Sequence, residues 1–187
     1  MAKKTIVLLA DGFEDVEAVT PIDYLQRAGI EVTAASISGS LTVTSKWGGI
    51  KMTATSTLAE VTKQGITGYD AIILPGGMPG TANLAASKET GALIKDMAAN
   101  GKLICAICAA PALVLAPLGL LKGKKFTCYP NMEEKVTDGK WSDDRVVTDG
   151  NIITSRGAGT AGEFAVTIIE KLLDKAAAQK LAETVLL

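Results

Sequence analysis

The chain has 187 residues, 48% of them hydrophobic and 21% charged, a size and composition typical of one globular domain with a full core. Nineteen basic residues balance 20 acidic ones and only 4% are aromatic, which excludes the basic field and stacking platform of a nucleic-acid-binding protein. The sequence contains no histidine, so a Ser-His-Asp triad, a Cys-His pair and an HExxH zinc site are excluded as well.

Along residues 1–187, which we interpret as one domain, short apolar runs alternate with helical patterns. The runs are rich in Val, Ile and Leu, which favours strands of a parallel sheet buried on both faces. The first four predicted strands are residues 4–10, 31–37, 71–74 and 103–107. Between them, residues 16–28 and 89–100 have helical patterns that end at Gly29 and Gly101.

The first apolar run follows Lys3 and Lys4 and could mimic a signal peptide. The run is short and ends at Asp11 and Glu14, and no apolar stretch in the chain approaches the length of a membrane span. Three cysteines, an odd number, fit reduced thiols better than a disulfide framework. We therefore expect a cytoplasmic protein with neither a membrane nor a nucleic acid as a partner.

The rest of the chain continues the alternation. Residues 41–44 and 51–53 flank Trp47-Gly48-Gly49 and predict a hairpin. A helix is expected from Cys108 to about Leu118, followed by short strands at 125–127, 145–148 and 152–154 and by helices at 160–173 and 176–186. This order predicts an α/β sandwich in which helices cover both faces of a mostly parallel sheet.

Ligands of open α/β sheets gather at the carboxyl ends of the strands, where the fourth predicted strand leads into Cys108. Pro111 favours the start of a helix just beyond this cysteine. The positive end of that helix is expected to favour the thiolate and to make the sulfur nucleophilic. The alternative is a cysteine that only packs in the core.

Two more segments should reach the same edge of the sheet. Gly76 and Gly77 follow the third strand, and paired glycines let backbone N–H groups face a ligand closely, although an ordinary tight turn has the same pattern. In the first helix, Glu14 and Asp15 are explained as surface residues that complement the helix dipole. Glu17 lies among apolar neighbours, where burial would raise the pKa of its carboxyl and let it donate to a thiolate; a solvated first-turn residue is the alternative.

Four motifs occur in a characteristic order: Ala-Asp-Gly-Phe-Glu-Asp-Val-Glu17, Ile-Leu-Pro-Gly-Gly77, Ile-Cys108-Ala-Ala-Pro and Thr154-Ser-Arg-Gly-Ala-Gly-Thr160. Together they resemble the ThiJ/PfpI superfamily and are most similar to its branch of parkinsonism-associated protein deglycases. The resemblance extends from the first predicted strand to the last helix.

The resemblance implies a flavodoxin-like three-layer sandwich and a homodimer. It implies a nucleophilic cysteine at Cys108, a protonated Glu17, and backbone N–H donors around Gly76, Gly77 and Ala109. The implied activity is a glyoxalase or protein deglycase that needs no glutathione, metal or other cofactor. Its substrates would be small aldehydes such as methylglyoxal, which yields lactate, or glycated proteins.

The chain departs from the family at one position near the cysteine, where many members have a histidine before a proline and this chain has Tyr129-Pro130. Tyr129 can donate a hydrogen bond, but a phenol with a reference pKa of about 10 is a poor base at neutral pH. Cys-His protease chemistry is therefore disfavoured. Arg156 is a candidate to bind anionic groups of a substrate.

Two motifs suggest other functions. Cys105-Ala-Ile-Cys108 matches the C-x-x-C of dithiol redox proteins, but Cys105 falls inside a strand, which favours core packing. Gly157 to Gly162 match G-x-G-x-x-G, but no strand with an acidic residue follows, so we expect close packing near the site rather than a dinucleotide. A redox sensor or stress chaperone that acts through oxidation of Cys108 remains an alternative, whereas no residue supports a role in thiazole biosynthesis.

Overall fold

In the computed structural model of the chain, which describes residues 2–47 and 49–187, seven strands form one sheet in the order β10-β11-β7-β6-β1-β2-β5. The strands are β1 (Lys4–Leu9), β2 (Glu31–Ser36), β5 (Ser56–Thr57), β6 (Ala71–Leu74), β7 (Leu103–Ile107), β10 (Val146–Asp149) and β11 (Ile152–Ser155). All neighbours pair in parallel except β10, which is antiparallel to β11. The five strands β2, β1, β6, β7 and β11 have the 2-1-3-4-5 order of a flavodoxin-like fold.

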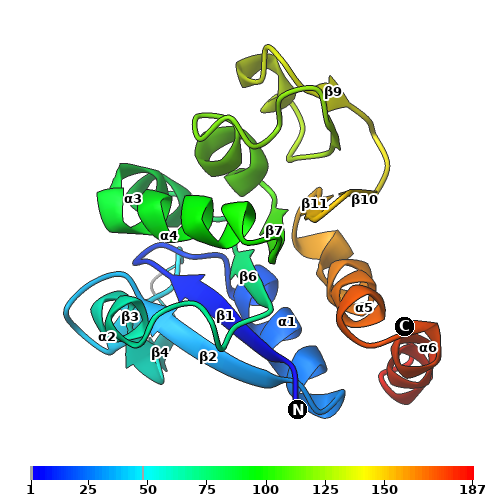
Figure 1. Cartoon of the computed structure of the whole chain (residues 1–187), viewed down its shortest axis with the longest axis horizontal. Coiled ribbons are helices and arrows are strands. Elements are labelled where there is room, and N and C mark those ends of the chain that lie inside the picture. Colours follow the sequence, from blue (N-terminus) through cyan, green and yellow to red (C-terminus); the bar gives the residue numbers. More distant parts are fainter. Residues whose placement is uncertain (1, 48) are drawn as a thin grey trace.

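Helices cover both faces of this sheet (Figure 1). On one face lie α1 (Asp15–Arg27), α5 (Ala161–Leu172) and α6 (Lys175–Thr184), and on the other α2 (Leu58–Gln64), α3 (Gly80–Ala86) and α4 (Lys88–Ala99). Alternate residues of β1 divide between the two cores: Ile6 and Leu8 pack with α2 and α4, while Val7 and Leu9 pack with α1 and α5. The predicted α/β three-layer sandwich is therefore confirmed.

Several short elements escaped the sequence patterns. These are β5, α2, α3, the strand β9 (Lys140–Trp141), which pairs with β8 (Lys125–Phe126), and the 3-10 turns Glu133–Lys135 and Ala158–Thr160. The predicted hairpin is present as β3 (Thr42–Thr44) and β4 (Lys51–Thr53), although Gly48 in its turn lies outside the described residues. No helix within residues 2–47 and 49–187 is long and apolar enough to cross a membrane.

The helix predicted from Cys108 to about Leu118 is wrong in length. The chain forms a single π-helical turn at Pro111–Leu115, closed by the Ala116 N–H, which donates to the Pro111 carbonyl at 3.0 Å. Pro117 has no N–H to continue the helical hydrogen bonds, although Ala116 before it still has helical dihedral angles. Gly119 then adopts a positive φ of 77° and turns the chain away.

Candidate active site

A cavity of about 310 Å³ opens where β1, β6 and β7 end. Carboxyl ends of parallel strands meet at one edge of a sheet, so segments far apart in the sequence converge there. The lining residues come from the start of α1, the β3–β4 turn and the segments after β6, β7 and β8: Glu14, Glu17, Lys46, Trp47, Gly77, Met78, Cys108, Ala109, Tyr129, Met132 and Ala158.

Cys108 follows β7 directly and has a φ of 65°, a left-handed conformation that a side chain with a Cβ rarely adopts. Its neighbours hold it there, because the Cys108 N–H donates to the Ser155 carbonyl at 2.9 Å and its carbonyl accepts from the Tyr129 N–H at 2.8 Å. The backbone N–H groups of Gly77 and Ala109 donate to its sulfur. The turn thus presents a half-buried thiol with two donors aimed at it.

Glu17 lies in the first turn of α1, on the face that packs against the sheet, and its residue is 1% exposed. Its Oε2 accepts the Gly76 N–H at 2.8 Å, and its carboxyl is hydrogen-bonded to Cys108. A Cβ at Gly76 would come within 2.6 Å of the Cys108 Cβ and would collide with Glu17 Oε2. Only glycine at position 76 lets the acid and the thiol meet.

Burial sets the proton affinities of this pair. Loss of solvation raises the pKa of Glu17 to about 7, although its hydrogen bonds to Cys108 and Gly76 oppose the rise. Burial and the charge of Glu17 raise the pKa of the Cys108 thiol to about 12, against the lowering effect of the Gly77 and Ala109 N–H groups. The expected depressed thiol pKa is therefore wrong, because burial and the adjacent Glu17 carboxyl both disfavour the thiolate.

The two other cysteines are inaccessible. Cys105 is 0% exposed inside β7, and burial raises the pKa of its thiol well above the usual value. Cys128 is also 0% exposed, and burial raises the pKa of its thiol to about 12. The position of Cys105 in the core between the sheet and α1 agrees with the packing interpretation of the C-x-x-C motif.

The structure brings most of the predicted site residues together. Gly77, Ala109 and Tyr129 line the cavity with Cys108 and Glu17. The N–H of Gly76, which we expected to face a substrate oxygen, instead donates to Glu17.

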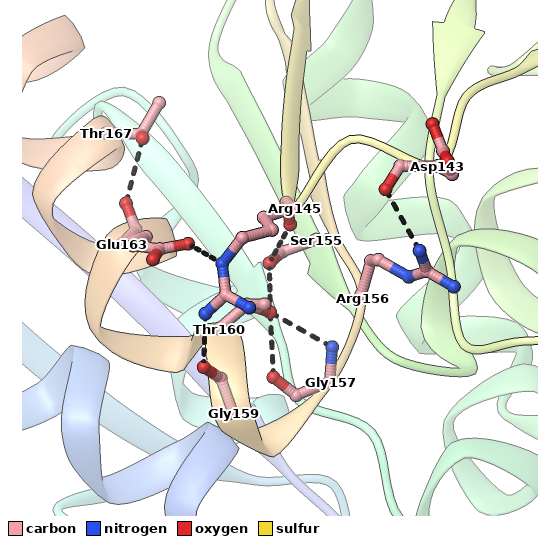
Figure 2. Close-up of polar contacts among 9 residues, drawn as sticks. All are labelled: Asp143, Arg145, Ser155, Arg156, Gly157, Gly159, Thr160, Glu163 and Thr167. Atoms are coloured by element: carbon pink, nitrogen blue, oxygen red, sulfur yellow. Dashed lines mark hydrogen bonds and ion pairs between the residues drawn. The ribbon is translucent and has the colours of Figure 1, made fainter.

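Arg156 does not line the cavity. Figure 2 shows its guanidinium directed at the carbonyl of Asp143, which accepts from Nη1 at 2.9 Å. Its role as an anion binder stays a prediction.

The Gly157–Gly162 motif forms a fixed rim beside the site. Thr160 Oγ1 lies 2.7 Å from Ser155 Oγ and donates to the Gly157 carbonyl at 2.8 Å (Figure 2). A Cβ on Gly157 would lie 3.5 Å from the Tyr129 ring and 3.7 Å from Glu17 Oε1. After α5, the described chain continues with α6 and no further strand, which agrees with the expectation that the motif does not bind a dinucleotide. A Cβ on Gly157 would make only ordinary van der Waals contacts and one on Gly159 would meet no atom within 4 Å, so close packing by these two glycines stays a prediction.

Sequence reasoning missed several residues of the cavity. Glu14, interpreted as a surface residue, lines the cavity, and Oδ1 of its neighbour Asp15 is buried without a hydrogen-bond partner. Lys46 and Trp47 come from the β3–β4 turn, and Met78 follows the glycine pair. The Gly-Gly-Met-Pro run was the one available signal for Met78. Within residues 2–47 and 49–187, no group of three or more Cys, Asp or Glu side chains is arranged to hold a metal ion.

Comparisons with known proteins identify the family to which the chain is similar. The DJ-1/PfpI family model matches residues 3–171. Protein DJ-1 homolog B of Arabidopsis thaliana is 43% identical over 181 residues, which are 97% of this chain and 40% of the plant protein, so the chain spans less than half of that relative. Glutathione-independent glyoxalase DJR-1.2 of Caenorhabditis elegans is 36% identical over 91% of this chain and 89% of its own length. The solved structure of oxidized Toxoplasma gondii DJ-1 has a TM-score of 0.94 at 39% identity and covers 99% of this chain and 98% of its own.

Proposed function

The chain belongs to the DJ-1/PfpI family, and on that premise we propose that it is a cysteine-dependent, cofactor-free glyoxalase that converts methylglyoxal to lactate. Removal of early methylglyoxal adducts from proteins would follow from the same chemistry. The observation that carries the proposal is the buried Glu17 carboxyl against the half-buried Cys108 thiol at the base of a cavity. A carboxyl with a pKa of about 7 can accept and return a proton at neutral pH.

The first step is addition of sulfur to the aldehyde carbon. The pKa values of about 12 for Cys108 and about 7 for Glu17 leave the resting proton on sulfur, so the thiol proton passes to Glu17 as the sulfur attacks. Sγ of Cys108 bonds to C1 of methylglyoxal while the C=O double bond opens onto its oxygen, which then takes the proton from Glu17, so that a neutral hemithioacetal and an ionised Glu17 result. The N–H groups of Gly77 and Ala109, which are aimed at the sulfur, are the donors available to the new oxyanion.

The second step moves a hydrogen between adjacent carbons. Ionised Glu17 takes the proton from C1, and the released electron pair forms a C1=C2 bond while the C2 carbonyl opens onto its oxygen, which gives an enediol once the C2 oxygen is protonated. Glu17 then returns the proton to C2, and the hydroxyl on C1 loses its proton to become the thioester carbonyl. C1 is thereby oxidised and C2 reduced, so the product is a lactate thioester of Cys108 and no external oxidant is needed. Water then cleaves the C–S bond, lactate leaves, and the thiol regains its proton.

The same pair supports a second function, a sensor of peroxide. Two equivalents of peroxide would oxidise the Cys108 thiolate to a sulfinate and release two waters. Glu17, when protonated, would donate a hydrogen bond to the sulfinate. The half-buried position of Cys108, against two fully buried cysteines, favours oxidation at this sulfur alone.

A homodimer is part of the proposal, as the family resemblance implies. Val16 and Val19 of α1 are 45% and 44% exposed, and Ile50 before β4 is 48% exposed. The hairpin is tied to the segment before α1, because the Lys46 N–H donates to the Phe13 carbonyl at 2.7 Å. These apolar side chains are the candidate contact surface between two copies.

The deciding experiment is lactate release from methylglyoxal by purified, chelator-treated protein. We expect steady turnover by the wild type and none by Cys108→Ser or Glu17→Gln. Stoichiometric oxidation of Cys108 by peroxide, without any lactate formation, would refute the glyoxalase and support the peroxide sensor.

A further inference from the structure

The cavity is larger than methylglyoxal requires. Pockets that hold drug-sized ligands have volumes of roughly 300–1,000 Å³, and this cavity, at about 310 Å³, reaches that range. Methylglyoxal has only about five non-hydrogen atoms, each taking up less space than one water molecule's share of about 30 Å³. With its aldehyde at Cys108, such a substrate leaves more than half of the space unfilled.

The unfilled part is bordered by large apolar side chains, which we call the collar: Trp47, Met78, Tyr129 and Met132. Three of them are unusually exposed for their types, Met78 at 45%, Tyr129 at 51% and Trp47 at 74%. The four collar residues come from three separate segments, yet all of them line the cavity that contains the thiol of Cys108. Exposed apolar side chains gathered at one opening mark a binding surface.

The charges around the cavity do not favour an anionic substituent. Glu14 and Lys46 contribute one charge of each sign, Glu17 adds a second carboxyl, and the Lys46 Nζ lies 4.6 Å from the centroid of the Trp47 ring. Arg156, the predicted anion binder, does not line the cavity and is directed at the Asp143 carbonyl (Figure 2). The lining therefore has no excess of positive charge, and its remaining character is apolar.

We propose that the preferred substrates are 2-oxoaldehydes with a bulky apolar or aromatic substituent, which the collar binds while Cys108 holds the aldehyde. This inference rests on the proposed glyoxalase function and names its substrate class. Met78 and Met132 are specificity-determining residues, because unbranched thioether side chains adapt to irregular ligands and make favourable contacts with aromatic rings. Tyr129 adds an aromatic face for an edge or offset contact.

The chemistry is unchanged for such a substrate. In phenylglyoxal, Cys108 Sγ adds to the aldehyde carbon, and Glu17 transfers a proton from that carbon to the neighbouring one. Water then cleaves the thioester to release mandelate. The aldehyde carbon is oxidised and the ketone carbon reduced, so the reaction needs only water.

The test compares initial rates of acid formation from phenylglyoxal and methylglyoxal. A single methylene in a hydrophobic pocket changes kcat/KM by about 10–200-fold, so we expect at least about a tenfold preference for phenylglyoxal. Met78→Gln and Met132→Gln keep side-chain length but add polarity, and each should lower this preference about fivefold, chiefly through the KM of phenylglyoxal. Leu173→Gln, at an exposed position outside the cavity, is the matched control and should retain the preference.

A measurement without turnover separates this inference from the proposed function. Acetophenone carries the aromatic ring but no aldehyde, so it should slow alkylation of Cys108 by iodoacetamide, whereas acetone at the same concentration should not. Protection by acetophenone without turnover of either aldehyde would leave the apolar binding site standing and refute the glyoxalase. Turnover of methylglyoxal with no preference for phenylglyoxal and no protection would overturn the inference alone.

Discussion

Replacing Glu17 with glutamine should remove a pH dependence of stability that the buried carboxyl creates. The pKa of Glu17 is about 7 in the folded protein, against an ordinary value of 4.5. The folded state therefore binds this proton more tightly than the unfolded chain does. The stability that results is fully present below about pH 4.5 and is lost as the pH rises through 7. Between pH 5 and pH 8 the loss amounts to about 2.5 kcal/mol.

Glutamine keeps the acceptor for the Gly76 N–H but cannot ionise, so Glu17→Gln should not show this loss. The loss of stability between pH 5 and pH 8 is measured by urea unfolding at the two pH values. The protein concentration is kept fixed, because the protein is proposed to dimerise. With a slope of about 2 kcal/mol per molar, the midpoint of the wild type should fall by about 1 M relative to the variant. Glu170→Gln, an exposed site on α5, should behave as the wild type. Parallel midpoints of wild type and Glu17→Gln at both pH values would refute the buried, proton-binding carboxyl.

Three further predictions concern the site and the assembly. Limiting iodoacetamide followed by peptide mapping should label Cys108 almost alone, since the two other thiols are fully buried; equal labelling of all three would contradict the geometry. Gly76→Ala should abolish lactate formation and cost about 1–3 kcal/mol, because the new Cβ collides with Glu17 and the cysteine, while Gly39→Ala, which meets no neighbour, should change neither activity nor unfolding. Val19→Glu should convert a dimer into a monomer in light scattering at micromolar concentration, and a wild type that is monomeric there would exclude the proposed dimer.

Much of the site could be predicted because its main signals are local. The run from residue 103 to 107 is apolar without interruption, which places a buried strand, and Cys108 stands at its end. Glu17 is an acid among apolar neighbours at a helix start, and the structure buries it to 1% exposure. The period of the pattern and the rule that parallel strands present their carboxyl ends at one edge indicated where both residues lie, whereas the choice between a functional and a merely packed or solvated side chain came from the family resemblance.

The rest depends on contacts that no local pattern encodes. Lys46 and Trp47 reach the cavity because the β3–β4 hairpin is tied to the loop after β1, where the Gly12 N–H donates to the Thr44 carbonyl at 2.8 Å. The thiol pKa was predicted in the wrong direction for a similar reason. Pro111 indicates a helix start, from which a lowered thiol pKa was inferred. The opposing effects of burial and of the Glu17 carboxyl on the thiol pKa can be inferred only when the position of Glu17 relative to the sulfur is known.

The absence of histidine from the sequence has a physical counterpart in the site. Histidine is the usual acid–base group at neutral pH because its reference pKa is about 6.5. Burial brings the Glu17 carboxyl to a pKa of about 7, so desolvation gives an ordinary glutamate nearly the same proton affinity. The raised pKa has a consequence for stability, because the free energy of unfolding is lower when the buried carboxyl is ionised. Because the N–H of Gly76 and the thiol are both hydrogen-bonded to this carboxyl, the group that transfers protons in the proposed mechanism is also the group that orients the sulfur. In the proposed mechanism Tyr129, which stands where the family resemblance implies a histidine, contacts the substrate and carries no proton.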